Sequence, residues 1–219
     1  MSSVTLYRAS GLALLLGFLL AVSGFVLRVL VVPGIPTPTQ LASALFVCLQ
    51  VLIFCGLALL LFGGLGIVAR LAELAGWLGL AGALLLFLSG VVIVGISAVN
   101  WLATPWLAVH APANVATQVA FGTPAAGVAA LVAGWLILVG GVLAEIAMMR
   151  ARLLSPWAGL LLIVGAVLGL VWDFAIHSYL VGFVILVGAI VLVVLGLGWM
   201  AYALLIAKGE VPQQPAPTP

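Results

Sequence analysis

The chain has 219 residues, of which 67% are hydrophobic and 5% are charged, and its formal net charge is +2. A soluble domain has about a quarter of its residues charged and could not bury this much apolar surface, so the composition excludes a soluble globular protein. The few Lys and Arg residues form no basic stripe, which excludes a nucleic-acid-binding protein. The long apolar runs predict a membrane protein built from α-helices.

Runs of bilayer-crossing length predict an all-α, polytopic transmembrane bundle with six spans. About 20 apolar residues make one helical crossing of a hydrocarbon core near 30 Å thick, because backbone inside lipid must satisfy its hydrogen bonds within a helix. The predicted spans cover residues 10–32, 41–68, 76–99, 125–148, 156–177 and 181–207, in one domain of residues 1–208. Residues 209–219 are rich in proline and predict a disordered cytoplasmic tail.

Prolines and charged residues mark the first turns along the chain. Pro33, Pro36 and Pro38 cannot continue a helix, so they predict an extended loop after the first span. Arg70 and Glu73 then interrupt the apolar sequence and predict the turn of a helical hairpin.

The segment from residue 100 to residue 124 contains prolines and polar side chains and predicts a surface segment. His110, Asn114 and Gln118 recur in it every four residues, a spacing that places them on one side of a short helix. We expect this helix to lie in the plane of the membrane interface on the outer side.

Residues 156–207 are almost continuously apolar and predict the last two spans. As one helix they would extend about 78 Å, far more than the hydrocarbon core can hold, so the chain must turn within them. The polar residues Asp173 and His177 lie where the fifth span ends, and a short connection is predicted between residues 177 and 182.

The distribution of Lys and Arg predicts the orientation of the bundle. Short cytoplasmic loops are enriched in these residues. In the six-span arrangement only Arg28 lies towards the other side, which places both termini in the cytoplasm. The residues that share the cytoplasmic side are Arg8, Arg70, Arg150, Arg152 and Lys208.

Residues 1–23 offer an alternative, because Arg8, the apolar run and Ala21-Val22-Ser23 imitate the three regions of a cleaved signal peptide. Apolar sequence continues to Val32, however, which leaves room for a full span and favours a retained helix.

A weak internal similarity appears at an offset of 80 residues. Arg70, Trp77 and Gly79 correspond to Arg150, Trp157 and Gly159. A parallel repeat, as found in some transporters, would explain this correspondence. The general preference of inner membrane boundaries for Arg followed by Trp would explain it equally well.

The stretch from Arg152 to Gly169, RLLSPWAGLLLIVGAVLG, resembles a segment that is common in uncharacterised multi-span bacterial membrane proteins. The resemblance covers mainly the second to fifth spans. It implies the same topology and a bacterial inner membrane, the cell's plasma membrane. These families have no assigned activity, so the resemblance implies no catalytic residue.

Ionisable residues inside spans are costly and are therefore candidates for a functional site. Arg28 in the first span and Asp173 and His177 in the fifth are predicted at one level near the outer surface. With His110 from the outer segment, they could line a polar vestibule that Asn114 and Gln118 extend. The alternative is an ion pair that only fixes helix packing, or an arginine whose head reaches the interface.

The second span carries one amide and two thiols. Gln50 could form an interhelical hydrogen bond or line a path through the bundle. Cys48 and Cys55 would lie about 10 Å apart along a helix, beyond disulfide reach, and we expect them to be buried free thiols.

Small residues spaced by four predict close helix contacts at two places. Gly17 with Ala21 and Gly165 with Gly169 are the clearest pairs. The glycine-rich stretch that begins at Gly63 is not followed by Lys-Ser or Lys-Thr, so no nucleotide site is predicted. No spacing of His, Cys, Asp or Glu specifies a metal or cofactor site.

These observations predict a non-enzymatic structural or accessory membrane component, surrounded by lipid and associated with a membrane protein partner or a second copy of itself. The alternative is a small transporter or channel-like carrier that uses Arg28, Asp173 and His177 in an outer vestibule. A second alternative is an enzyme subunit that binds a metal or haem through His110 and His177.

Overall fold

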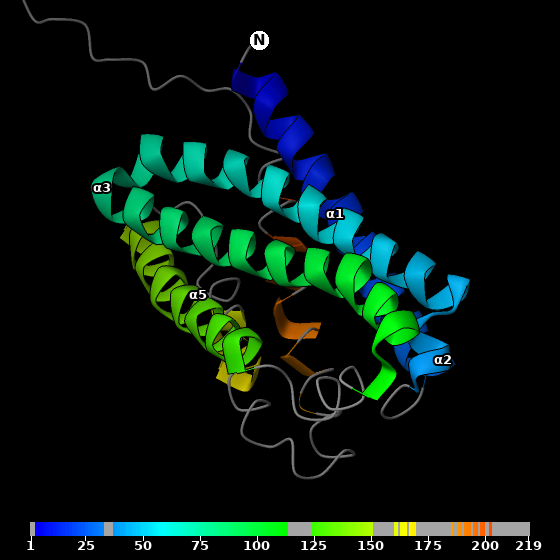
Figure 1. The fold of residues 1–219 in the computed structure, drawn as a ribbon. Coiled ribbons are helices and arrows are strands. Elements are labelled where there is room, and N and C mark those ends of the chain that lie inside the picture. The colour runs from blue at the N-terminus through cyan, green and yellow to red at the C-terminus, as the bar shows by residue number, and fades with distance from the viewer. Residues whose placement is uncertain are drawn as a thin grey trace, which may run out of the picture.

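The computed structural model describes residues 3–32, 37–113 and 124–150, and isolated positions between residues 160 and 202. Every regular element in these stretches is a helix, which confirms the predicted all-α fold class for them. Figure 1 shows the elements in chain order. They are α1 (Ser3–Val31), α2 (Pro38–Leu41), α3 (Ala44–His110) and α5 (Pro124–Arg150).

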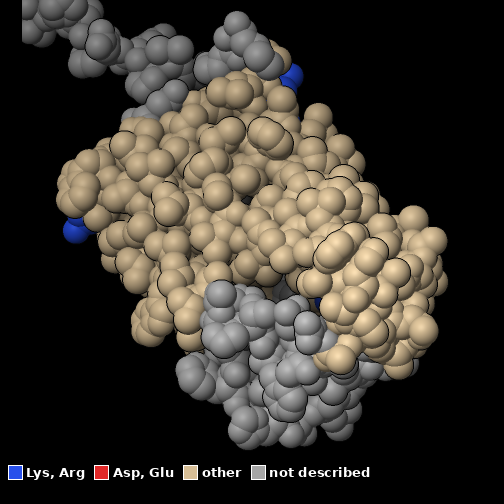
Figure 2. Space-filling view, in the orientation of Figure 1, with Lys and Arg blue, Asp and Glu red and all other residues tan. Residues whose placement is uncertain are grey.

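Four stretches of helix are long and apolar enough to cross a membrane, namely Thr5–Val31, Ala44–Ala69, Gly76–His110 and Gly127–Arg150. On the face shown in Figure 2 the described residues are almost entirely uncharged, and most of the visible Lys or Arg atoms lie at its margins. The molecule is thus a membrane-embedded helical protein. The predicted fifth and sixth spans fall mostly outside the described residues.

Helix α3 consists of two antiparallel halves that meet at Gly76. This glycine has φ 63° and ψ −155°, a conformation that is essentially restricted to glycine and breaks the helix there. The two halves then run side by side in Figure 1. Phe46 at the start of α3 packs with Ala108 near its end. The predicted hairpin after Arg70 is therefore present.

The second half of α3 is longer than predicted. The predicted third span ends at residue 99, whereas the helix continues through Pro105 to His110. Proline removes one backbone hydrogen bond, and burial of Ala108 against Leu41 and Phe46 holds the helix beyond it. With 35 residues, this half is about 52 Å long and extends beyond a hydrocarbon core near 30 Å.

Glycines bring α1 and the first half of α3 into backbone contact. A Cβ atom at Gly17 would lie 2.6 Å from the Leu60 nitrogen and 2.7 Å from the Gly56 oxygen. A Cβ at Gly56 would meet the backbone of Ala21 in the same way. The predicted close contact at Gly17 and Ala21 is confirmed.

In the other predicted pair of small residues, Gly165 and Gly169, only the first makes a close helix contact. At Gly165 a Cβ would lie 2.9 Å from the Val193 nitrogen and 3.0 Å from the Ala189 oxygen, so the predicted close contact is present there. At Gly169 a Cβ would meet nothing within 4 Å, so this glycine is not needed for a contact.

Helix α5 packs on the second half of α3 through a second glycine contact. A Cβ at Gly82 would lie 2.9 Å from the Gly140 oxygen, and Ala144 beside it is fully buried. Ser89 adds a hydrogen bond across this interface, because its hydroxyl donates to the Ala133 carbonyl oxygen at 2.9 Å. Among the described elements, α3 contacts each of α1, α2 and α5 and forms the centre of the bundle.

Substitution of Ser89 by alanine is expected to destabilise the protein modestly, because the Ser89 side chain is completely buried and its bond to Ala133 is lost. Side-chain hydrogen bonds between membrane helices contribute about 0.6 kcal/mol on average and up to about 1.7 kcal/mol. Unfolding of the purified protein in mixed micelles with increasing denaturing detergent measures this loss. Ser89→Cys is the control of similar size, and an unchanged free energy of unfolding in Ser89→Ala would contradict the assignment.

The two cysteines differ from their prediction in burial. Cys48 and Cys55 are free thiols, but both are exposed rather than buried. Their spacing of seven residues puts them on one side of α3, and this side faces away from the packed interfaces. A thiol behaves as a small apolar group, so lipid accommodates it as readily as a protein interior does.

Candidate functional site

Arg28 lies in the last turn of α1 and packs on an aromatic ring. Its guanidinium carbon is 5.8 Å from the centroid of the Phe46 ring, within the range of a cation–π contact. The side chain is half-buried. Within the described residues no acidic group pairs with it, and Asp173, its predicted partner, lies outside them. The contact that the structure gives Arg28 is therefore one between α1 and α3.

His110 is the last residue of α3, and its side chain contacts Trp106 in the preceding turn of the same helix. Its Nδ1 lies 2.8 Å from the Trp106 carbonyl oxygen, which accepts the hydrogen bond, and its ring stacks on Trp106 with centroids 4.4 Å apart. Because Phe46 contacts both Arg28 and Ala108, His110 lies at the same end of the bundle as Arg28. The predicted companions of His110, namely Asn114, Gln118 and His177, fall outside the described residues.

Gln50 is buried in the first half of α3, with only 5% of its surface exposed. It lies one turn from Phe46 and one turn from Phe54, whose ring packs on Trp101 at a centroid distance of 5.7 Å. Trp101 Nε1 is buried and has no hydrogen-bond partner in the described part of the chain. Two polar groups thus lie in the apolar interface towards the end of the bundle that holds Arg28.

Glu145 is a buried acidic residue outside the predicted polar cluster. It is 7% exposed and follows the fully buried Ala144 in α5. An acid inside an apolar run is the signal that could have singled it out. In the stretches the structure describes, no three His, Cys, Asp or Glu side chains gather closely enough to hold a metal ion.

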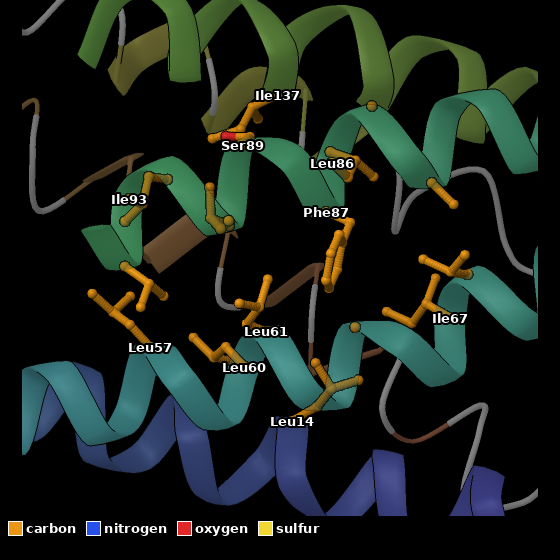
Figure 3. Close-up of a pocket in the computed structure, with 17 residues that line it drawn as sticks. Leu14, Leu57, Leu60, Leu61, Ile67, Leu86, Phe87, Ser89, Ile93 and Ile137 are labelled. Atoms are coloured by element: carbon orange, nitrogen blue, oxygen red, sulfur yellow. The ribbon is translucent and has the colours of Figure 1, made fainter. Parts of the chain in front are cut away.

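An apolar cavity of about 250 Å³ lies between the two halves of α3. Leu57 and Leu61 project into it from the first half, and Phe87 and Ile93 face them from the second half (Figure 3). Helices α1 and α5 and the residue Val193 complete its wall.

Three glycines line the cavity, and one of them, Gly64, has open space in front of it. Gly64, Gly90 and Gly141 all line the cavity and place no side chain in it. A Cβ at Gly64 would meet no atom within 4 Å. Among the lining residues, Ser89 is the one with a polar side chain. Its hydroxyl already donates a hydrogen bond to the Ala133 carbonyl oxygen.

Neither water molecules nor empty space would be a stable content of this cavity. Apolar cavities stay dry because water finds too few hydrogen-bond partners in them. An unfilled apolar space leaves its lining atoms without van der Waals partners on one side, which destabilises the fold. A hydrocarbon group inside it would regain the lost van der Waals contacts.

Comparison with known protein families, with curated proteins and with solved structures finds no match for this chain.

Proposed function

We propose that this protein is a multi-pass integral membrane protein that acts as a structural or accessory component without enzymatic activity. The proposal includes six spans, cytoplasmic termini and a location in the plasma membrane of a bacterial cell. The four long apolar helices support the membrane assignment. The five cationic residues on one side of the predicted spans support the orientation.

The observation that carries this proposal is that three polar side chains of the described helices make contacts within or between helices. Arg28 of α1 contacts the Phe46 ring of α3. Ser89 of α3 donates a hydrogen bond to the Ala133 carbonyl of α5. His110 forms a hydrogen bond with the Trp106 carbonyl oxygen of its own helix. A catalytic or transport site would need such groups to point at a common space accessible to a solute.

A second candidate function is a small carrier with an outer vestibule. The buried Gln50 favours it, as does Trp101 Nε1, which has no hydrogen-bond partner among the described residues. A permeation path needs polar groups inside the apolar bundle. In this case Arg28, Asp173 and His177 would form the entrance.

Solute flux through vesicles containing the purified protein distinguishes the two functions. We expect release of H⁺, Na⁺, K⁺ and Cl⁻ to equal that of protein-free vesicles, as measured with ion-sensitive dyes. A flux above this level that Asp173→Asn abolishes would contradict the accessory role and assign a carrier. Glu145→Gln is the matched control, because it removes the charge of the other acid within a span.

A further inference from the structure

The cavity lies entirely among segments that cross the membrane. Leu14 belongs to Thr5–Val31, Leu61 to Ala44–Ala69, and Phe87 to Gly76–His110, and further lining residues come from α5 and Val193. Phe87 and Ile93 lie 11 and 17 residues from Gly76, about 16 and 26 Å along the helix, so the space is at the depth of lipid chains.

The chemistry of the wall selects a hydrocarbon ligand. The lining side chains are aliphatic apart from the ring of Phe87 and the hydroxyl of Ser89, which already donates to Ala133. A ligand with a charged or hydrogen-bonding group would leave that group unsatisfied in this wall. Engineered cavities of about 150 Å³ with similar linings bind benzene, so 250 Å³ holds a longer apolar segment.

We propose that this cavity binds a segment of the acyl chain of a membrane lipid. The cavity is not fully enclosed, and most of its wall belongs to helices long and apolar enough to cross a membrane. We therefore expect a chain to enter it from the bilayer while its headgroup stays outside. An acyl chain is compatible with the apolar wall and fills the open space in front of Gly64. Neither an accessory role nor a carrier role for the protein is required for this binding.

A larger side chain in place of Gly64 would fill the cavity and block binding. A side chain at this position has free space in front of it, so Gly64→Leu is expected to fill the cavity without moving a helix. Gly95 is the matched control, because it also meets nothing within 4 Å, lies in α3, and is exposed rather than part of the wall. Gly95→Leu changes the lipid-facing surface alone.

The test uses the full-length protein in phosphatidylcholine vesicles that contain phosphatidylcholine with a diazirine in the middle of one acyl chain. After illumination, mass spectrometry locates the attached lipid. We expect attachment at Leu61 and Phe87 in addition to the exposed Leu65 and Leu88. Gly64→Leu should reduce attachment at the two cavity residues at least fivefold, and Gly95→Leu should leave it unchanged.

Attachment to Leu65 and Leu88 without attachment to Leu61 and Phe87 in the unaltered protein would overturn the proposal, whether or not Gly64→Leu folds. Unchanged attachment at Phe87 in a folded Gly64→Leu would also overturn it. A free diazirine-bearing alkane serves as a second probe. If it labels Phe87 while the lipid does not, the cavity binds a free apolar solute and not a lipid chain.

Discussion

Substitution of Gly56 by alanine is expected to destabilise the protein by about 1–3 kcal/mol, the usual cost of overpacking a close-packed interface. A Cβ at this position would lie 2.7 Å from the Gly17 oxygen and 2.8 Å from the Ala21 Cα, and both are backbone atoms. No side-chain rotation relieves such a contact, so α1 must move away from α3. Detergent-induced unfolding of the purified protein, followed by circular dichroism, measures the loss.

Gly95→Ala is the control for this substitution. Gly95 is also helical, but a Cβ there would meet no atom within 4 Å. Alanine has the higher helix propensity, so the variant should be as stable as the unaltered protein or slightly more stable. Equal stability of Gly56→Ala and Gly95→Ala would show that the contact between α1 and α3 does not stabilise the fold.

Substitution of Gly76 by alanine is expected to cost about 1–3 kcal/mol for a different reason, namely backbone strain. At φ 63° and ψ −155° an L-residue with a side chain is strongly disfavoured. The space around Gly76 is open, so no steric contact with another residue contributes. The same unfolding measurement reports this cost, and Gly95→Ala again serves as the control with open space and a helical backbone.

A destabilised Gly76→Ala should also show a weaker association of the two halves of α3, since the turn at Gly76 brings Phe46 next to Ala108. Proteolysis of the connection between the helices should become faster in this variant. If Gly76→Ala unfolded at the same detergent concentration as the unaltered protein, the reversal of the chain at this glycine would be contradicted.

The turns could be predicted from the sequence because breakers of helices act locally. Three prolines after Val32 and the charged pair at Arg70 and Glu73 interrupt the apolar runs, and the helices end or turn close to these places. The contact at Gly17 and Ala21 was also predictable, since two small residues one turn apart let another backbone approach.

The end of α3 could not be predicted from the local sequence. In the sequence, Pro105 cannot be distinguished from a proline in a loop. The burial of Ala108 against Leu41 and Phe46 keeps the helix intact beyond it. These residues lie more than 60 positions away along the chain. Contacts of this range outweigh the local preference of a proline.

The buried faces of the helices were not predictable either. In a soluble helix the polar residues mark the exposed face, but in lipid both faces are apolar, so Cys48 could not be assigned to the surface or to the interior from the sequence. The cavity depends on the rotation of several helices relative to one another, which brings Gly64, Gly90 and Gly141 to one space. Their sequence positions are unrelated.

The polar vestibule, in which Arg28 and His110 would meet Asp173 and His177, remains a prediction. Arg28 and His110 lie at one end of the bundle. Asp173 and His177, which would bring them into one site, fall outside the described residues.

The accessibility of single cysteines from the two sides of the membrane tests the central claim most directly. In a variant with Cys48→Ala and Cys55→Ala, Thr39→Cys reports on the turn between α1 and α3, and Trp77→Cys reports on the turn at Gly76. Both replaced side chains are exposed. In intact cells an impermeant maleimide should label Thr39→Cys at once, and should label Trp77→Cys only after the membrane is opened. Labelling of Trp77→Cys in intact cells, or equal labelling of both positions, would contradict the proposed crossing and orientation of the helices.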